Sequence, residues 1–178
     1  MRCQKCELYK TRKNIVLGSG SISSRIIFIG EAPGFHEDRV GKPFVGKAGK
    51  IFDNMLSTIN LNRNQIYLTN IVKCRPPKNR NPTDEEISTC SKYLDIEIRN
   101  IQPKIIIPMG KFATQYILQK NDINFESMFK SRGVSIKTRD YIIYPIYHPA
   151  ALIYNNDLKS VMKDDMKRIK EIIEGDKK

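Results

Sequence analysis

Hydrophobic residues along this 178-residue chain fall into two patterns, short continuous runs and positions repeated at helical spacing. Four runs are typical of strands buried on both faces, and they lie at residues 25–30, 65–72, 104–109 and 141–147. Helical spacing predicts helices at residues 48–60, 111–119 and 157–174, the last ended by Gly175. A further helix is predicted to begin at the capping box formed by Thr83 and Glu86.

The alternation of strands and helices predicts an α/β fold with a mainly parallel sheet and helices on both of its faces. The sequence contains no internal repeat and no low-complexity linker, so we expect one domain over residues 1–178. Ligands of open α/β sheets bind outside the carboxyl ends of the strands. Four segments are therefore expected to converge there, namely GEAPG (30–34), Asn70, Gly110 with Lys111, and HPAAL (148–152).

Charge predicts the class of partner. The chain carries 31 Lys and Arg against 19 Asp and Glu, and the formal net charge of +12 favours a polyanion such as nucleic acid. Residues 73–82 hold four basic residues and no acidic one, so we predict DNA-backbone contacts from Lys73, Arg75, Lys78 and Arg80. The alternative is that the charge serves solubility alone.

Hydropathy argues against a membrane protein. No apolar run approaches the roughly 20 residues of a membrane span, and MRCQKCELYK at the N-terminus lacks the apolar region of a signal peptide. We therefore expect a soluble, cytoplasmic protein without a membrane partner. A composition rich in Lys, Ile and Glu also favours a thermophilic source.

The four cysteines lie at positions 3, 6, 74 and 90. In an intracellular protein a C-x-x-C pair indicates a metal or redox site more often than a structural disulfide. A tetrathiolate site made of Cys3, Cys6, Cys74 and Cys90 can hold either Zn²⁺ or an iron–sulfur cluster, and the spacing does not choose between them. The alternative is two buried free thiols and a flexible C-x-x-C tail.

Five ordered motifs and the cysteines together resemble one family. The motifs are GEAPG followed by FHED, GKPFVGKAG, YLTNIVKCRPPKNRNPT, PMGKFA and YHPAAL. They resemble the family 4 uracil-DNA glycosylases, the iron–sulfur-containing branch of that superfamily, from Cys3 to about Lys170. The resemblance implies a three-layer α/β sandwich with a four-stranded parallel sheet, a [4Fe-4S] cluster rather than zinc, and removal of uracil from DNA without a divalent metal.

The resemblance also implies roles for individual residues. Glu31 would act on the hydrolytic water, Phe44 would stack on uracil, Asn70 would read the base edge, and His148 would polarise the base; Ala32 joins the uracil-binding residues. These residue types suit the chemistry, because breaking the bond leaves negative charge on uracil and positive charge on the sugar. The sequence does not identify the neighbour that orients the Asn70 amide. The alternatives are a turn-capping carboxylate for Glu31, a helix-entry residue for His148 and core packing for Phe44.

Base flipping adds further candidates. In YHPAAL the small Ala150 lets the backbone approach phosphates, and Leu152 is predicted to wedge into the vacated stack unless it belongs to the core. Lys111, after the third strand, is another predicted DNA contact. A sliding-clamp partner stays open, and a monomer is the default expectation.

Two rival functions compete with excision. The first is a non-catalytic, metal-containing nucleic-acid-binding protein, which would bind DNA without producing abasic sites. The second is a phosphate-ester hydrolase that uses carboxylates around a divalent metal, and the sequence shows no suitably spaced carboxylate set for it.

Overall fold

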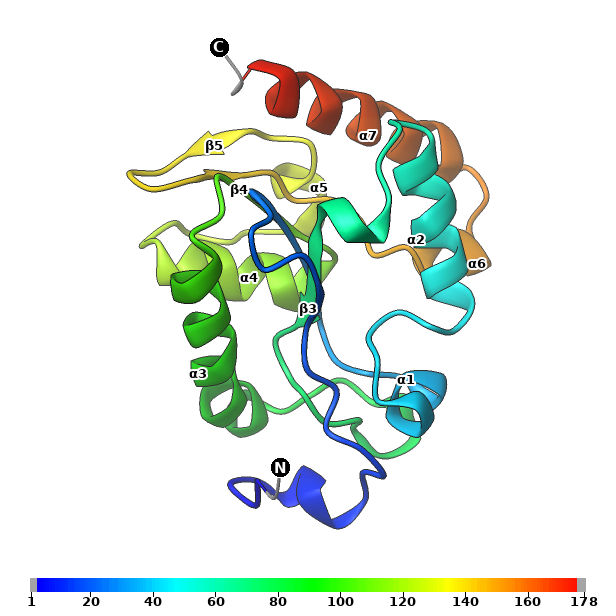
Figure 1. The fold of residues 1–178 in the computed structure, drawn as a ribbon, viewed down its shortest axis with the longest axis vertical. Coiled ribbons are helices and arrows are strands. Elements are labelled where there is room, and N and C mark those ends of the chain that lie inside the picture. Colours follow the sequence, from blue (N-terminus) through cyan, green and yellow to red (C-terminus); the bar gives the residue numbers. More distant parts are fainter. Residues whose placement is uncertain (1–2, 176–178) are drawn as a thin grey trace.

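The computed structural model describes residues 3–175, which form a mixed sheet covered by helices (Figure 1). The strands are β1 (Ser19–Gly20), β2 (Ile26–Gly30), β3 (Tyr67–Asn70), β4 (Ile105–Pro108), β5 (Ile136–Lys137) and β6 (Ile142–Ile143). They lie in the order β1-β3-β2-β4-β6-β5. The four central strands run parallel, while β1 and β5 pair antiparallel at the two edges.

Helices cover both faces of this sheet. The longer ones are α2 (Lys47–Ser57), α3 (Asp84–Ile101), α4 (Lys111–Lys120) and α7 (Leu158–Gly175). The shorter ones are η1 (Glu7–Lys10), α1 (Phe35–Val40), η2 (Arg63–Gln65), η3 (Pro77–Asn79), α5 (Met128–Ser131) and α6 (Ala151–Tyr154). Figure 1 shows α2 and α7 on one side of the strands and α3 and α4 on the other.

The layers follow from the alternation of side chains along the central strand β2. Phe28 packs with the core of α2 and α7, and its ring centroid lies 5.0 Å from that of Phe52. Ile27 and Ile29 point to the opposite face, into a second core that includes Leu94 of α3 and residues of α4. Because successive residues of a strand face opposite sides, a strand buried on both faces must be apolar throughout.

The predicted α/β sandwich with its parallel sheet is confirmed. The four parallel strands and four long helices lie where the hydrophobic pattern places them. The sequence missed the edge strands β1 and β5, which have two residues each, and the helix α1 within the expected loop after β2. Within residues 3–175, no helix is both long and apolar enough to cross a membrane.

Candidate active site

The carboxyl ends of β2 and β3 place two polar side chains next to each other. Gly30 ends β2 and pairs in register with Asn70, the last residue of β3. Glu31 follows directly, and its carbonyl accepts a hydrogen bond of 3.0 Å from the backbone N–H of Val72. The two strand ends are therefore held together by the sheet's own hydrogen bonds, which fixes the chain on which both side chains are mounted.

A pocket of about 650 Å³ opens at these strand ends. It brings together six of the residues predicted from the sequence, and their segments lie up to 119 positions apart in the chain, from 31 to 150. The six are Glu31, Ala32, Phe44, Asn70, His148 and Ala150. The segments at the carboxyl ends of β2, β3 and β6 therefore converge, as predicted.

Phe44 is held in a left-handed backbone conformation, with φ = 54°, which is uncommon for a residue other than glycine. Its carbonyl accepts a hydrogen bond from the Arg63 guanidinium. A Cβ at Gly49 would lie 1.8 Å from that carbonyl oxygen, so only glycine permits this packing. On the other side, Glu37 accepts hydrogen bonds of 2.8 Å from the N–H groups of Val45 and Gly46, the two residues that follow Phe44. Such strain persists only where its surroundings impose it, as at binding sites.

The Phe44 ring lies inside the pocket rather than at its edge. Phe44 is 5% exposed, and its ring stacks on the imidazole of His148 with centroids 5.6 Å apart and an interplanar angle of 30°. A Cβ at Gly30 would lie 2.7 Å from its Cζ atom and 2.4 Å from Oδ1 of Asn70. The missing side chain of Gly30 thus allows both groups to approach the end of β2. Phe44 also belongs to the core, as its alternative interpretation predicts, and its stacking on uracil stays a prediction.

Within residues 3–175, one ring nitrogen of His148 has a hydrogen-bond partner and the other has none. Its Nδ1 accepts a hydrogen bond of 3.2 Å from the backbone N–H of Ala150, from which we infer that the proton sits on Nε2. Burial lowers the pKa of His148 to about 4, against an opposing effect of the Glu37 charge. The imidazole is therefore neutral at neutral pH and presents a single N–H donor.

Glu31 and Glu37 both line the pocket, and their carboxylates differ in their hydrogen bonds. Glu37 caps the turn, because it accepts hydrogen bonds from the N–H groups of Gly34, Val45 and Gly46. Within residues 3–175, no protein group donates a hydrogen bond to the Glu31 carboxylate, and burial raises its pKa. The turn-capping interpretation thus applies to Glu37, to which the sequence analysis did not assign that role. Its signal was the position three residues into α1.

Asn70 carries an unsatisfied acceptor. The residue is 2% exposed, and its Oδ1 has no hydrogen-bond partner among the described residues. Buried polar atoms without partners are rare and usually have a functional explanation. The Asn70 oxygen is therefore a candidate acceptor for a ligand's hydrogen bond.

The N-terminal segment carries Cys3 and Cys6 to the side of the molecule that holds Cys74 and Cys90. Cys6 packs against the same core as the buried Cys74 and Cys90. Arg12 joins the segments, because it donates to the Cys3 carbonyl at 2.6 Å and to the Cys74 sulfur at 3.5 Å. The flexible-tail alternative therefore does not describe this segment.

The thiols sit in a partly polar environment. The backbone N–H of Lys73 donates to the Cys90 sulfur at 3.2 Å, and the Tyr93 hydroxyl lies 3.5 Å from the Cys3 sulfur. Burial raises the pKa of Cys90 and raises that of Cys74 to about 11. Within residues 3–175, no group of three or more Cys, His, Asp or Glu side chains is placed to hold a metal ion.

Comparison with known proteins assigns the family. Residues 17–170 match the model of the Uracil DNA glycosylase superfamily. Proteins named type-4 uracil-DNA glycosylase share 47% identity over 175 residues in Sulfurisphaera tokodaii and 45% over 177 residues in Saccharolobus solfataricus. These alignments cover 96% and 97% of this chain and 80% and 82% of the relatives. A third, from Archaeoglobus fulgidus, shares 42% identity over 176 residues, covering 97% of this chain and 88% of its own.

The chain belongs to the type-4 uracil-DNA glycosylases. The resemblance seen in the motifs is thereby confirmed. Four of the five motifs, all except PMGKFA, contribute residues to the pocket at the strand ends.

The predicted DNA contacts of this family member need one correction. Lys73 is only 2% exposed, and its ammonium group donates to Thr69 Oγ1, the Asn70 carbonyl and Glu97 Oε2 at 2.6–2.7 Å. It is therefore not available to a phosphate. The prediction failed because the sequence does not show that Glu97 supplies a buried counter-charge.

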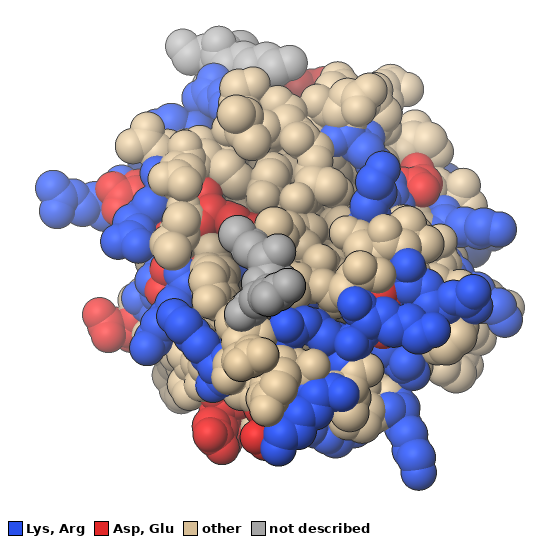
Figure 2. All heavy atoms as spheres, turned by 60° about the horizontal axis from the view of Figure 1, so that its bottom comes forward, with Lys and Arg blue, Asp and Glu red and all other residues tan. Residues whose placement is uncertain are grey.

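The other basic candidates reach the surface. Arg80 forms two hydrogen bonds with Glu86, at 2.6 and 2.8 Å, and Arg75 donates to Asn79 at 2.7 Å. Lys78 and Lys111 are exposed. Figure 2 shows that Lys and Arg outnumber Asp and Glu on the face that includes the bottom of Figure 1, where α1 lies. These four residues remain predicted DNA contacts.

Leu152 lies on a different side of its segment from the pocket. It packs against the core and lines a groove together with residues of α2 and α7, such as Met55 and Met162. The core alternative therefore describes Leu152 in this glycosylase, and the structure does not place it as a wedge.

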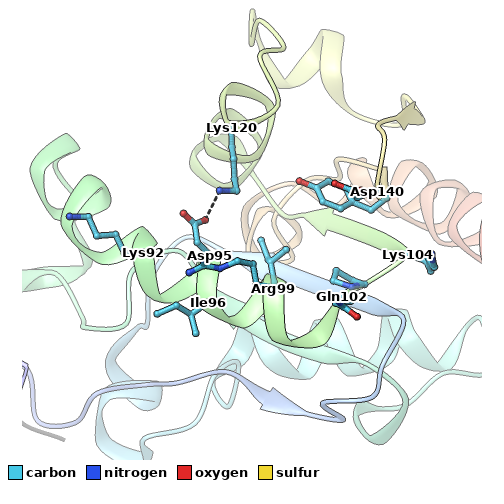
Figure 3. Close-up of a pocket in the computed structure, with 11 residues that line it drawn as sticks. Lys92, Asp95, Ile96, Arg99, Gln102, Lys104, Lys120 and Asp140 are labelled. Atoms are coloured by element: carbon cyan, nitrogen blue, oxygen red, sulfur yellow. Dashed lines mark ion pairs between the residues drawn. The ribbon is translucent and has the colours of Figure 1, made fainter.

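A larger pocket, of about 880 Å³, lies at the opposite end of the sheet (Figure 3). It is bordered by Gln102 and Lys104, which precede β4, and by Asp140, which precedes β6. Figure 3 shows the ion pair of Lys120 with Asp95, whose charged atoms are 3.0 Å apart. None of the glycosylase motif residues lines this pocket, so the smaller pocket is the candidate active site.

Proposed function

We propose that this protein hydrolyses the N-glycosidic bond of uracil in DNA and leaves an abasic site, with Glu31 and His148 as its catalytic residues. The observation that carries the proposal is the meeting of four different groups in one pocket: a carboxylate without a protein partner, a neutral imidazole, a stacking ring and an amide with an unsatisfied acceptor. Each group matches one requirement of the reaction.

His148 would stabilise the leaving uracil. As the bond breaks, negative charge develops on the base, largely on its carbonyl oxygens. The Nε2–H of neutral His148 would donate a hydrogen bond to one of these oxygens. Its Nδ1 bond to the Ala150 N–H fixes the donating nitrogen before the substrate arrives. A preorganised donor of this kind contributes about 10²–10³-fold in rate in other enzymes.

Glu31 would act on the other side of the bond. Its carboxylate can align a water below the anomeric carbon and stabilise the positive charge that develops on the sugar. Charge and orientation matter more than proton abstraction here, because an oxocarbenium ion is already a strong electrophile. The absence of a protein donor to the carboxylate within residues 3–175 leaves it free for the water and the sugar.

Phe44 and Asn70 would hold the flipped base. The Phe44 ring offers a stacking surface, a contact worth about 1–3 kcal/mol per base. The Asn70 amide can accept from N3–H of uracil and donate to O4, which would satisfy its unpaired oxygen. The exposed basic residues would bind the DNA backbone without reading its sequence.

We further propose that Cys3, Cys6, Cys74 and Cys90 hold a [4Fe-4S] cluster that pins the N-terminal segment to the core. The donor set is four thiols, which ligate such clusters. Zinc binds the same set of four thiolates, so the choice of a cluster rests on the resemblance to the iron–sulfur-containing family. The expected role of the cluster is structural.

The cluster proposal is tested on the purified protein by its iron and sulfide content and by its visible absorption. Cys74→Ser should lose both iron and absorption and lower the melting temperature. Ser91→Ala, a buried change on the same helix as Cys90, is the matched control and should keep the absorption. Stoichiometric zinc without iron would contradict the proposal.

The excision proposal is tested with a fluorescently labelled oligonucleotide that contains one uracil, in single-stranded and duplex form, with and without EDTA. Strand breakage should appear only after alkali, should be insensitive to EDTA, and should be absent when thymine replaces uracil. Glu31→Gln and His148→Ala should each reduce the rate strongly while DNA binding persists.

Glu85→Gln, which removes an exposed carboxylate of α3, serves as the control and should keep the wild-type rate. Full activity of Glu31→Gln would refute the assignment of that residue. Tight DNA binding without any abasic product in the wild type would instead favour the non-catalytic binding protein.

A further inference from the structure

The short helix α6 has one aromatic side chain that stands free at the rim of the active-site pocket. Tyr154 is 88% exposed and lines the pocket together with Glu31 and His148. Within residues 3–175, no ring or cation stacks on it. An exposed ring of this size has no role in the core.

The helical geometry explains why Tyr154 and Leu152 face different ways. Residues four apart share one face of a helix, so Tyr154 stands above Ala150, and both line the pocket. Leu152 is two residues from each and points to the other side, where it packs on the core. Hydrogen bonds from the N–H groups of Ala151 and Leu152 to the carbonyls of His148 and Pro149 hold this turn in place.

The two other benzene rings of the pocket are already engaged. Phe44 stacks on His148. Phe35 carries two guanidinium groups over its ring, those of Arg75 at 5.1 Å and Arg39 at 5.6 Å from its centroid. Of the benzene rings that line this pocket, Tyr154 therefore has the free faces that a nucleobase needs for stacking.

We propose that Tyr154, rather than Leu152, is the residue that occupies the gap left by the flipped nucleotide and stacks on the neighbouring base. The proposal rests on the assignment of this pocket as the active site. Tyrosine suits the position, because its ring can lie against a base while its hydroxyl stays in water. Side chains that insert between base steps stabilise the unstacked duplex.

The test compares single-turnover excision from a uracil-containing duplex with excision from the same strand alone. The duplex requires a wedge, whereas the single strand requires little unstacking. Tyr154→Ala should lower the ratio of duplex to single-strand rates by about 5- to 150-fold, the effect of losing one base-stacking contact. Tyr154→Phe should keep the wild-type ratio, because the ring is retained.

Two control variants separate this role from general damage. Phe129→Ala removes another exposed aromatic ring, 86% exposed on α5, and should not change the ratio. Leu152→Ala should lower the melting temperature and keep the ratio. An unchanged ratio in Tyr154→Ala, or a fall in Leu152→Ala alone, would overturn the proposal.

The same assay distinguishes a failed wedge from a wrong active site. If the pocket is not the active site, Glu31→Gln keeps its rate on the single strand. If only the wedge assignment is wrong, Glu31→Gln still loses that rate while Tyr154→Ala keeps the wild-type ratio.

Discussion

Replacing Lys73 by methionine tests whether this residue holds the fold or binds DNA. Its ammonium group contacts three acceptors, Thr69 Oγ1, the Asn70 carbonyl and Glu97 Oε2, at 2.6–2.7 Å. Methionine keeps most of the side-chain volume but donates no hydrogen bond. Burial lowers the pKa of Lys73, and the nearby Glu97 carboxylate opposes that effect. The positive charge of Lys73 therefore depends on Glu97.

The expected loss of stability can be bounded from these contacts. Removing one partner of a buried ion pair costs about 3–5 kcal/mol. Glu97 keeps donors from Thr69, Tyr67 and the N–H of Gly18 at 2.8–3.4 Å, so we expect the lower end, about 3 kcal/mol. For a chain of this length that corresponds to a fall of about 6–12 °C in melting temperature.

Urea unfolding and thermal melting of Lys73→Met measure this loss directly. The double variant Lys73→Met/Glu97→Gln should recover part of it, because the stranded carboxylate is gone. Lys78→Met is the contrast: it should leave stability within about 0.5 kcal/mol and reduce the salt dependence of DNA binding by one phosphate contact. A stable Lys73→Met protein with weakened, less salt-dependent DNA binding would refute the structural role.

Three further predictions concern the pocket. Because burial raises the pKa of Glu31 above its ordinary value near 4.5, excision should decline on acidification at a pH above 4.5, and Glu31→Gln should lack that decline. The folded state binds this proton more tightly, so stability falls as pH rises through the raised pKa, and Glu31→Gln should unfold at higher temperature at pH 7. Gly30→Ala, whose Cβ would lie 2.4 Å from Asn70 Oδ1, should lower excision by about 10²-fold in an otherwise folded protein. Gly49→Ala should cost at least about 1–3 kcal/mol of stability in urea unfolding, because its Cβ would meet the Phe44 carbonyl at 1.8 Å.

The hydrophobic pattern was sufficient for the elements that contain a continuous or periodic apolar signal. Strands β2, β3, β4 and β6 and the four long helices carry such signals. The edge strand β1 does not, because its two residues, Ser19 and Gly20, pair through backbone groups alone. Helix α1 has six residues, of which the capping residue Glu37 is the third, so its signal is too short for periodicity.

The residues of the site also fall into those that the sequence could place and those that it could not. Residues at strand ends, such as Glu31 and Asn70, could be placed from the sequence because parallel strands bring their carboxyl ends to one edge. Lys73 could not, since its burial depends on Glu97, 24 positions away. The orientations of Leu152 and Tyr154 could not be predicted either, because they depend on how the single turn of α6 lies between the pocket and α7.

The unpaired Asn70 amide bears on how uracil is told from cytosine. Within residues 3–175, no group donates a hydrogen bond to the amide oxygen, so no such bond selects the amide orientation that suits uracil over the one that suits cytosine. Binding alone then discriminates poorly. The transition state differs more, because departing uracil spreads its charge over two carbonyl oxygens, whereas cytosine has one and needs a proton to leave well. In the proposed mechanism, neutral His148, with a pKa of about 4, would donate a hydrogen bond but would hold no extra proton to give at neutral pH. Discrimination should therefore arise chiefly in the bond-breaking step, where only differential stabilisation of the transition state affects the rate.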